Sequence, residues 1–286
     1  MPSDRDSVAI VGGGTMGVGL LYVFAAAGFD MTLVEPDAQR AEEVSKRLAE
    51  AAQNGVSRGK LDAAQAEAIT RGYRHLIEAA ALPEGQSLVI ESVPERLDLK
   101  RRVLSEIAAR RPQIIATNTS ALSVDALADA VTDASRFLGM HFFNPVWSLH
   151  LVEIVRGKAT TDLTLSAAHG YAEAIGKSAI TVTDTPGFAT SRLDLIAALE
   201  AIRMVEDGVA SAEDIDRAMM VAYRHPIGPL RLTDIVGLDV RLDIALALSK
   251  SLGPRYAPPR ILEEMVGRGE LGQKTGRGFF EWPEAA

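Results

Sequence analysis

The sequence predicts an α/β protein, with a doubly wound, mostly parallel sheet and an inserted helical hairpin, followed by a smaller all-helical domain. Short apolar runs alternate with helical segments over the first two thirds of the chain, as in a parallel sheet with crossover helices. A glycine-rich turn directly follows the first of these runs. Beyond a turn-forming cluster at residues 184–187, no strand pattern recurs. We therefore expect one domain over residues 1–184 and a second over residues 185–286.

Each predicted element follows from its own pattern. Apolar runs that end at turn signals predict buried strands at residues 8–11, 31–34, 88–91, 114–117, 137–141, 151–155 and 179–182. Helical composition predicts crossover helices at 16–27, 97–110, 124–130 and 164–175. Two further helices, at 38–54 and 62–69, exceed an ordinary crossover and indicate the inserted hairpin. In the second domain we expect helices at 189–207, 239–252 and 259–266, with a capping box at 211–214 opening another.

Composition excludes several functional classes. The chain of 286 residues has no cysteine, which removes disulfides, thiolate nucleophiles and cysteine-ligated metal sites. Its net charge of −8 argues against a nonspecific nucleic-acid binder. The N-terminal residues are polar, and the most apolar stretch, residues 18–29, falls short of the ~20 residues of a membrane span. We expect a soluble, cytoplasmic protein with no metal site.

The glycine-rich turn has the pattern of a dinucleotide-binding, Rossmann-type motif. Glycines stand at the positions needed for the tight turn, the pyrophosphate approach and close helix packing: Gly12, Gly14 and Gly17, interleaved with Gly13, Thr15 and Met16. Glu35 ends the second strand, 23 residues after Gly12 (35 − 12), where a carboxylate accepts ribose hydroxyls of NAD and repels the 2′-phosphate of NADP. The alternative is a turn used only for packing, with Glu35 a solvated strand end.

A second group of candidates follows three later strands. Asn118 and Ser120 lie at the carboxyl end of one strand, and His141 and Asn144 at the end of the next. A turn at Asn144-Pro145 would fold the following strand back and bring Glu153 towards His141. A carboxylate on one imidazole nitrogen leaves the other as a base near neutral pH. Each residue also has a structural alternative: a core histidine, a turn hydroxyl, a turn asparagine and a solvated carboxylate.

At this point the sequence resembles the L-3-hydroxyacyl-CoA dehydrogenases, including bacterial 3-hydroxybutyryl-CoA dehydrogenases. Motifs spread over nearly the whole chain carry the resemblance, namely residues 8–17, 89–95, 117–120, 141–145, 184–188, 225–229 and 272–280. The resemblance implies a Rossmann-type first domain, NAD as cofactor and a 3-hydroxyacyl thioester as substrate. It also implies a homodimer, in which the wide apolar surface of residues 189–207 would be buried between subunits.

The resemblance also implies residue roles. His141 would be the general base that takes the 3-hydroxyl proton, and Glu153 would orient it and stabilise its charge. Ser120 and Asn144 would bind the reacting oxygen, the thioester or the nicotinamide ribose region. Further cofactor contacts are implied at Glu95, Lys100, Asn118 and Lys274.

Three positions depart from the family pattern. Ser191 stands where relatives commonly have an active-site asparagine, and a serine reproduces only a shorter, weaker contact. Trp147 follows the His-Phe-Phe-Asn-Pro motif; it would narrow the acyl region if it faces that region, and would otherwise be a core aromatic. Arg231 occupies a position that is often acidic, for which the sequence offers no explanation.

The sequence leaves several functions open. The leading one is NAD-dependent interconversion of a short-chain 3-hydroxyacyl-CoA and its 3-keto form. One alternative substrate is a hydroxyacyl group on a carrier protein. Another is a free hydroxy or sugar acid, as in the gulonate dehydrogenase branch. A dinucleotide-binding protein without activity is the non-enzyme alternative.

Overall fold

The computed structural model describes residues 6–283, and its chain divides into two compact units, Met1–Phe188 and Ala189–Ala286. The expected boundary after residue 184 lies four residues before this division. The first unit is the α/β part and the second is the helical part, and each is described by itself. No helix among residues 6–283 is both long and apolar enough to cross a membrane.

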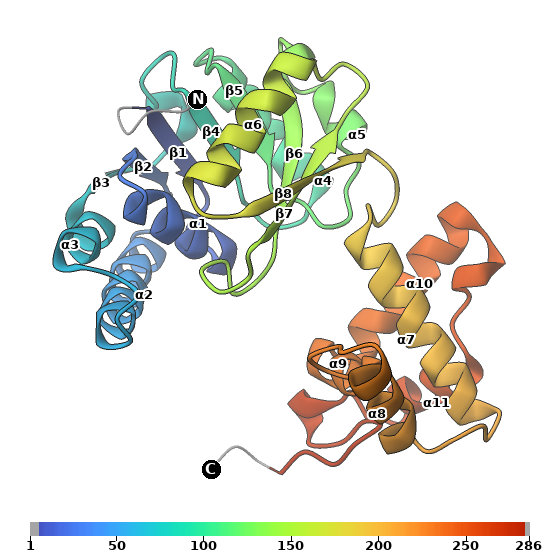
Figure 1. Ribbon diagram of the computed structural model, residues 1–286. Helices are drawn as coiled ribbons and strands as arrows, with labels where there is room; N and C mark the ends of the chain where they lie inside the picture. Colours follow the sequence, from blue (N-terminus) through green and yellow to red (C-terminus); the bar gives the residue numbers. More distant parts are fainter. Residues whose placement is uncertain (1–5, 284–286) are drawn as a thin grey trace. The chain divides into compact units, whose positions relative to one another are not determined.

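An eight-stranded sheet forms the centre of the first unit, in the order β3-β2-β1-β4-β5-β6-β7-β8 (Figure 1). All neighbouring strands are parallel except β6 and β7. The predicted doubly wound, mostly parallel sheet is thus confirmed. The strands are β1 (Ser7–Val11), β2 (Asp30–Val34), β3 (Tyr73–Leu76), β4 (Leu88–Glu91), β5 (Ile114–Thr117), β6 (Phe137–Phe142), β7 (Leu151–Arg156) and β8 (Ser178–Thr183).

The edge strand β3 was not predicted. It carries Arg74 and His75, which are exposed, and its flanking residues are only half-buried. Because an edge strand outside the core needs no apolar run, the apolar pattern that reveals buried strands is missing here.

Helices cover both faces of the sheet. One core cluster packs α1 (Thr15–Ala26), α2 (Ala38–Ser57), α3 (Ala63–Arg71) and α6 (Asp162–Ala174) against one face, and the other packs α4 (Leu97–Ala108) and α5 (Val124–Ala128) against the opposite face. The inserted hairpin is confirmed as α2 and α3. Asp37 caps the first of these helices, and Asp62 forms a capping box with Gln65 at the second.

The second unit is built from helices around one core. They are α7 (Thr190–Glu206), α8 (Ala212–Ala222), α9 (Pro229–Val236), α10 (Leu238–Leu252) and α11 (Arg260–Gly267). Within the described part of this unit, only isolated bridges join extended residues. Over residues 6–283, four short 3-10 turns complete the two units, at Ala79–Ala81, Ala134–Arg136, Pro254–Tyr256 and Gln273–Thr275.

Two details of this unit differ from the sequence expectations. The short helix α9 was missed, although Pro229 stands at its start, where proline is favoured. The expected capping box at residues 211–214 is present in part, because Ser211 accepts the Asp214 amide and donates its hydroxyl to the Asp214 carboxylate.

The structure accounts for Arg231. Its guanidinium lies over the Phe280 ring, 4.3 Å from the centroid, and over the Trp282 ring at 5.1 Å. Asp234 holds the same C-terminal segment, since it accepts the Phe279 and Phe280 amides and the Trp282 indole N–H. Arg231 therefore fastens the tail to the helical unit.

Candidate active site

The glycine turn lies between β1 and α1, next to the point where the strand order reverses. Gly12 has φ +110°, which favours glycine, and a Cβ on Gly17 would lie 1.8 Å from the Gly12 carbonyl oxygen. The chain itself therefore demands glycine at both positions. A Cβ on Gly14, in contrast, would meet nothing within 4 Å. The open space above Gly14, at the N-terminus of α1, fits the pyrophosphate of a dinucleotide.

Glu35 ends β2 beside this turn and is 2% exposed. Its Oε2 accepts the Gly13 amide at 2.8 Å, and its Oε1 accepts the Asp37 amide at 3.0 Å. The guanidinium of Arg40 stands 3.9 Å from Oε2. Glu35 is thus a fixed acceptor rather than the solvated strand end that the sequence left open, because its carboxylate is held against the glycine turn.

One cavity of about 1160 Å³ runs along the carboxyl edge of the sheet. The glycine turn, the ends of β2 and β4 and the loop after β5 form its walls, and the predicted site residues among its lining are Gly12, Gly13, Gly14, Thr15, Met16, Glu35, Glu95, Asn118, Ser120 and His141. Its size suits a dinucleotide-sized ligand. The structure therefore brings the predicted cofactor turn and the predicted base to the same cavity.

His141 and Glu153 face each other across the antiparallel pair β6 and β7. The His141 Nδ1 and the Glu153 Oε2 lie 2.7 Å apart, and Glu153 is fully buried. When Glu153 is ionised its carboxylate only accepts hydrogen bonds, and in that state Nδ1 carries the proton and Nε2 is the basic nitrogen. The sequence expectation that the Asn144-Pro145 turn folds Glu153 back onto His141 agrees with this register.

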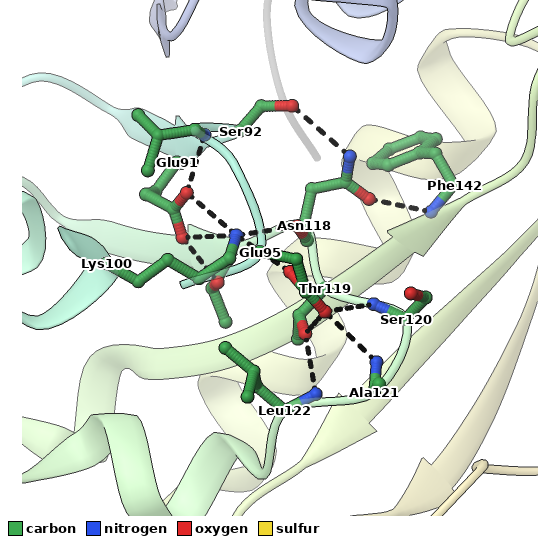
Figure 2. A network of polar contacts seen from close by, with 12 residues as sticks. Glu91, Ser92, Glu95, Lys100, Asn118, Thr119, Ser120, Ala121, Leu122 and Phe142 are labelled. Atoms are coloured by element: carbon green, nitrogen blue, oxygen red, sulfur yellow. Dashed lines mark hydrogen bonds and ion pairs between the residues drawn. The ribbon is translucent and has the colours of Figure 1, made fainter. Parts of the chain in front are cut away.

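A buried ion pair contacts Asn118 and Glu95, which line the cavity (Figure 2). The Lys100 ammonium donates to both Glu91 oxygens, at 2.9 and 3.0 Å, and to the Asn118 carbonyl at 3.0 Å. Both side chains are fully buried. Burial raises the pKa of the Glu91 carboxyl, and the Lys100 ammonium opposes this rise. Lys100 was expected to contact the cofactor; its ammonium instead points at Glu91, so its influence on a ligand would pass through its neighbours.

Glu95 joins this pair to the loop that carries Ser120. Its Oε1 accepts the Thr119 hydroxyl at 2.5 Å and the Ser120 and Ala121 amides at 3.0 and 3.1 Å (Figure 2). Burial acts to raise the pKa of the Glu95 carboxyl, but these hydrogen bonds and the Lys100 ammonium, 3.4 Å from Oε2, hold it below its usual value. Glu95 is therefore ionised, and its carboxylate fixes Ser120 at the cavity wall.

Asn118 links the ends of two other strands. Its Oδ1 accepts the Phe142 amide at 3.1 Å, and its Nδ2 donates to the Ser92 hydroxyl at 3.3 Å (Figure 2). Phe142 directly follows His141, so Asn118 fastens the end of β6 at the predicted base. Its side chain lines the cavity while making these bonds.

The loop after β6 carries two further candidates. Asn144 is exposed, three residues after His141. Trp147 is 40% exposed, and its ring packs on Tyr22 of α1 at 5.5 Å, so it is not a fully buried core aromatic. Lys177 fastens this loop, because its buried ammonium donates to the Val146 and Leu149 carbonyls at 2.6 and 2.7 Å.

Two predicted residues belong to the helical unit. Ser191 lies in the first turn of α7 and is half-buried. Lys274 pairs with both oxygens of Asp239, at 2.5 and 2.6 Å, at the start of α10. Their predicted contacts with substrate and cofactor stay predictions.

Sequence reasoning missed Glu91 and Arg40. Glu91 carried a usable signal, since a carboxylate at the end of an all-apolar strand is buried and needs a cation. The pairing with Lys100 nine residues later becomes visible only once α4 folds back on β4. Arg40 showed no signal, because an arginine early in a polar helix resembles any surface residue. No group of metal-ligating side chains occurs among residues 6–283.

Comparison with known proteins gives consistent results over both units. Residues 7–185 match the family model "3-hydroxyacyl-CoA dehydrogenase, NAD binding domain", and residues 187–282 match "3-hydroxyacyl-CoA dehydrogenase, C-terminal domain". A 3-hydroxybutyryl-CoA dehydrogenase of Bradyrhizobium diazoefficiens is 36% identical over 280 residues, 96% of this chain and 94% of its own length. The human mitochondrial hydroxyacyl-coenzyme A dehydrogenase is 34% identical, over 96% of this chain and 90% of its own.

A solved structure gives the same result. The crystal structure of (S)-3-hydroxybutyryl-CoA dehydrogenase from Ralstonia eutropha superposes with a TM-score of 0.93 at 35% identity. The match covers 98% of this chain and 100% of that one.

Proposed function

Because this chain belongs to the 3-hydroxyacyl-CoA dehydrogenase family, whose members are NAD-dependent oxidoreductases, we propose that it interconverts a short-chain 3-hydroxyacyl-CoA and the 3-ketoacyl-CoA. The observation that supports this most is the His141–Glu153 pair, held at 2.7 Å beside the cavity that the glycine turn opens. A general base and a dinucleotide turn on one cavity are what oxidation of a secondary alcohol needs.

In the proposed reaction, His141 Nε2 takes the proton of the substrate 3-hydroxyl. Bound NAD supplies the acceptor for the hydride that leaves C3. Glu153 holds the imidazole through Nδ1 and stabilises the positive charge that develops on it. In the opposite direction the imidazolium returns the proton to the oxygen, so the same pair serves both directions.

The other site residues act by binding and positioning. Ser120, held by Glu95, offers a hydroxyl at the cavity wall, and Asn144 follows the base along the chain. We assign both to the reacting oxygen or the thioester. We assign Glu35 to the ribose hydroxyls of the cofactor. Lys274 is assigned to the cofactor by resemblance alone, and Ser191 and Trp147 to the substrate only by their positions relative to the family motifs.

The substrate is tested by measuring NADH formation with NAD and a panel of alcohols. We expect turnover of 3-hydroxybutyryl-CoA, with little or none of free 3-hydroxybutyrate or L-gulonate. Preference for a carrier-protein-bound hydroxybutyryl group would move the assignment from CoA to carrier protein. Turnover of only the free acids would contradict the thioester assignment. NADH binding without turnover of any panel member would favour the non-enzymatic alternative.

We also propose that the protein is a homodimer. The helical unit exposes large apolar side chains, with Leu193 of α7 at 69%, Val221 of α8 at 74% and Tyr223 at 73%. Exposed apolar side chains that gather into one patch are buried in a protein–protein interface, and we assign these residues to that role. Light scattering should give twice the chain mass at micromolar concentration, and a monomer mass would contradict the proposal. The cytoplasmic location expected from the sequence stays a prediction.

A further inference from the structure

Two aromatic rings contact the imidazole of His141. The Phe143 ring lies 4.4 Å from it between centroids at an interplanar angle of 50°, and the Phe188 ring lies 5.8 Å away at 53°. Phe143 is a local neighbour, two residues further along the chain. Phe188 lies 47 residues further along the chain (188 − 141), after β8, so its contact with His141 depends on the tertiary fold.

The backbone at Phe188 has an unusual conformation. Its φ is +45°, a region that non-glycine residues seldom adopt and that persists only where the surroundings enforce it. The preceding residue, Gly187, also has a positive φ, of +74°, and the Phe188 amide closes a turn onto the Thr185 carbonyl at 3.0 Å. These two residues together reverse the chain and turn the ring inward, where it is 4% exposed.

The start of this turn is fastened to the sheet domain. Asp184 Oδ2 accepts the Ser123 hydroxyl at 2.7 Å and the Asp125 amide at 2.8 Å, at the first turn of α5. Phe188 itself packs into the core cluster on the α4 and α5 face. The first unit alone therefore supports the ring, through the Asp184 hydrogen bonds at α5 and the core cluster on the α4 and α5 face.

We propose that Phe188 is a positioning residue for the catalytic base, acting through the ring of His141. The inference rests on the function proposed above. The bond to Cβ and the hydrogen bond between Nδ1 and Glu153 Oε2 hold the imidazole at two points, which leaves it only small coupled rotations about χ1 and χ2. Phe143 and Phe188 remove this freedom, so that Nε2 keeps one direction towards the substrate hydroxyl.

The central test is Phe188→Leu in the full chain, with 3-hydroxybutyryl-CoA and NAD as substrates. Leucine keeps an apolar side chain and a similar backbone preference but loses the ring. We expect kcat to fall about 10-fold to 100-fold, the range in which small misplacements of a reacting group slow a reaction. The KM for NAD should stay within about twofold, because the glycine turn and Glu35 lie elsewhere. The matched control is Phe29→Leu, a ring that is 6% exposed and packs on Phe24 and Tyr171.

A second comparison separates positioning from general loosening. In a His141→Ala background, Phe188→Leu should cause no further loss of the residual rate, because its target is gone. An unchanged kcat in the folded single variant would overturn the proposal. A loss carried by the KM for NAD, or one of equal size in the His141→Ala background or in Phe29→Leu, would overturn it as well.

An independent readout covers the case in which the proposed function is wrong. If the wild-type protein turns over no 3-hydroxyacyl thioester, that function fails, and the ring contact is judged by NMR on histidine-labelled protein. Loss of the Phe188 ring current should move the His141 ring-proton resonances, assigned with His141→Gln, while Phe29→Leu leaves them in place. Unmoved resonances in Phe188→Leu would show that the contact is absent and that Phe188 does not position the base.

Discussion

Replacing Glu153 by glutamine tests how much the carboxylate contributes to the proposed reaction. The amide keeps the shape of the side chain, and its oxygen can still accept the Nδ1–H of His141, but it carries no charge. During the reaction the imidazole becomes positively charged. With Nδ1 and Oε2 at 2.7 Å, the two charge centres lie roughly 4 Å apart, and their attraction at an effective dielectric constant of about 20 is worth about 4 kcal/mol.

That energy sets the size of the expected loss. About 4 kcal/mol corresponds to roughly 10³ in rate, and the amide dipole retains part of it, so Glu153→Gln should lose about 10²–10³ in kcat/KM. His141→Ala removes the base itself and should lose about 10²–10⁴. Both variants should bind NADH as the wild type does, because neither residue belongs to the glycine turn. A fluorescence titration with NADH and a urea melt of each variant check that binding and folding are kept.

The double variant decides whether the two residues form a unit. A carboxylate that acts only through the imidazole has nothing to act on once His141 is alanine, so the double variant should be little slower than His141→Ala alone. Two independent contributions would instead multiply to a loss of about 10⁴ or more, from the same single-variant ranges. A multiplied loss would refute the dyad, and so would a Glu153→Gln enzyme that keeps more than about half the wild-type kcat/KM.

Three further predictions concern Glu35, Ser191 and Glu95. Glu35 should make NAD strongly preferred over NADP, and equal use of both cofactors by the wild type would contradict this role. Glu35→Gln should raise kcat/KM with NADP, because the Arg40 guanidinium, 3.9 Å from the carboxylate, can then pair with the 2′-phosphate. Adding Arg40→Ala should remove the gain. Ser191→Asn should raise activity on 3-hydroxybutyryl-CoA if the site lacks an amide and lower it if the serine is adapted to another substrate, whereas no change on any substrate would place the position outside the site. The hydrogen bonds to Glu95 outweigh the effect of burial and hold the pKa of its carboxyl below the usual 4.5. The contribution of Glu95 to the free energy of unfolding is therefore present above pH 4.5 and lost as the pH falls through the lowered pKa. In urea melts the wild type and Glu95→Gln should converge in stability in acid, and a constant difference would contradict this.

Local patterns were sufficient for much of this site. The glycine turn, Glu35 and Ser120 all follow buried strands directly, and strands of a parallel sheet end at one edge, so their proximity needs only the order of elements. The His141–Glu153 pair needed one further step, the reversal at Asn144-Pro145, because opposite residues of an antiparallel pair share a face. In these cases the position of a residue relative to its strand was enough to predict its neighbours in space.

Other parts of the site depend on contacts that no local pattern encodes. Lys100 matches a cofactor contact by sequence, yet the fold turns its ammonium towards Glu91, because a buried carboxylate attracts the nearest cation that α4 can bring. In the sequence Phe188 ends a turn-forming segment, and its ring contacts the His141 imidazole only once the sheet is complete. Likewise, exposed β3 and short α9 lack the long apolar period that identifies core elements.

Gly14 and Gly17 belong to one motif, but the space around them differs, so glycine is needed at each for a different reason. Two alanine variants distinguish these reasons. At Gly17 a Cβ would lie 1.8 Å from the Gly12 carbonyl oxygen, so Gly17→Ala should unfold at markedly lower urea. At Gly14 the backbone is extended, with φ −71° and ψ −172°, and a Cβ would meet nothing within 4 Å. Gly14→Ala should therefore lose no more than about 1 kcal/mol of stability, the usual effect of alanine at a helix N-cap.

The same Gly14→Ala variant should nevertheless bind NADH at least about tenfold more weakly. Its methyl group would occupy the space through which the pyrophosphate reaches the amides at the start of α1, and lost contact with those amides weakens anion binding directly. NADH titration of the folded variant measures this. Wild-type affinity would mean that the phosphates do not approach Gly14, and the reason for glycine at this position would then have to lie elsewhere than in the cofactor.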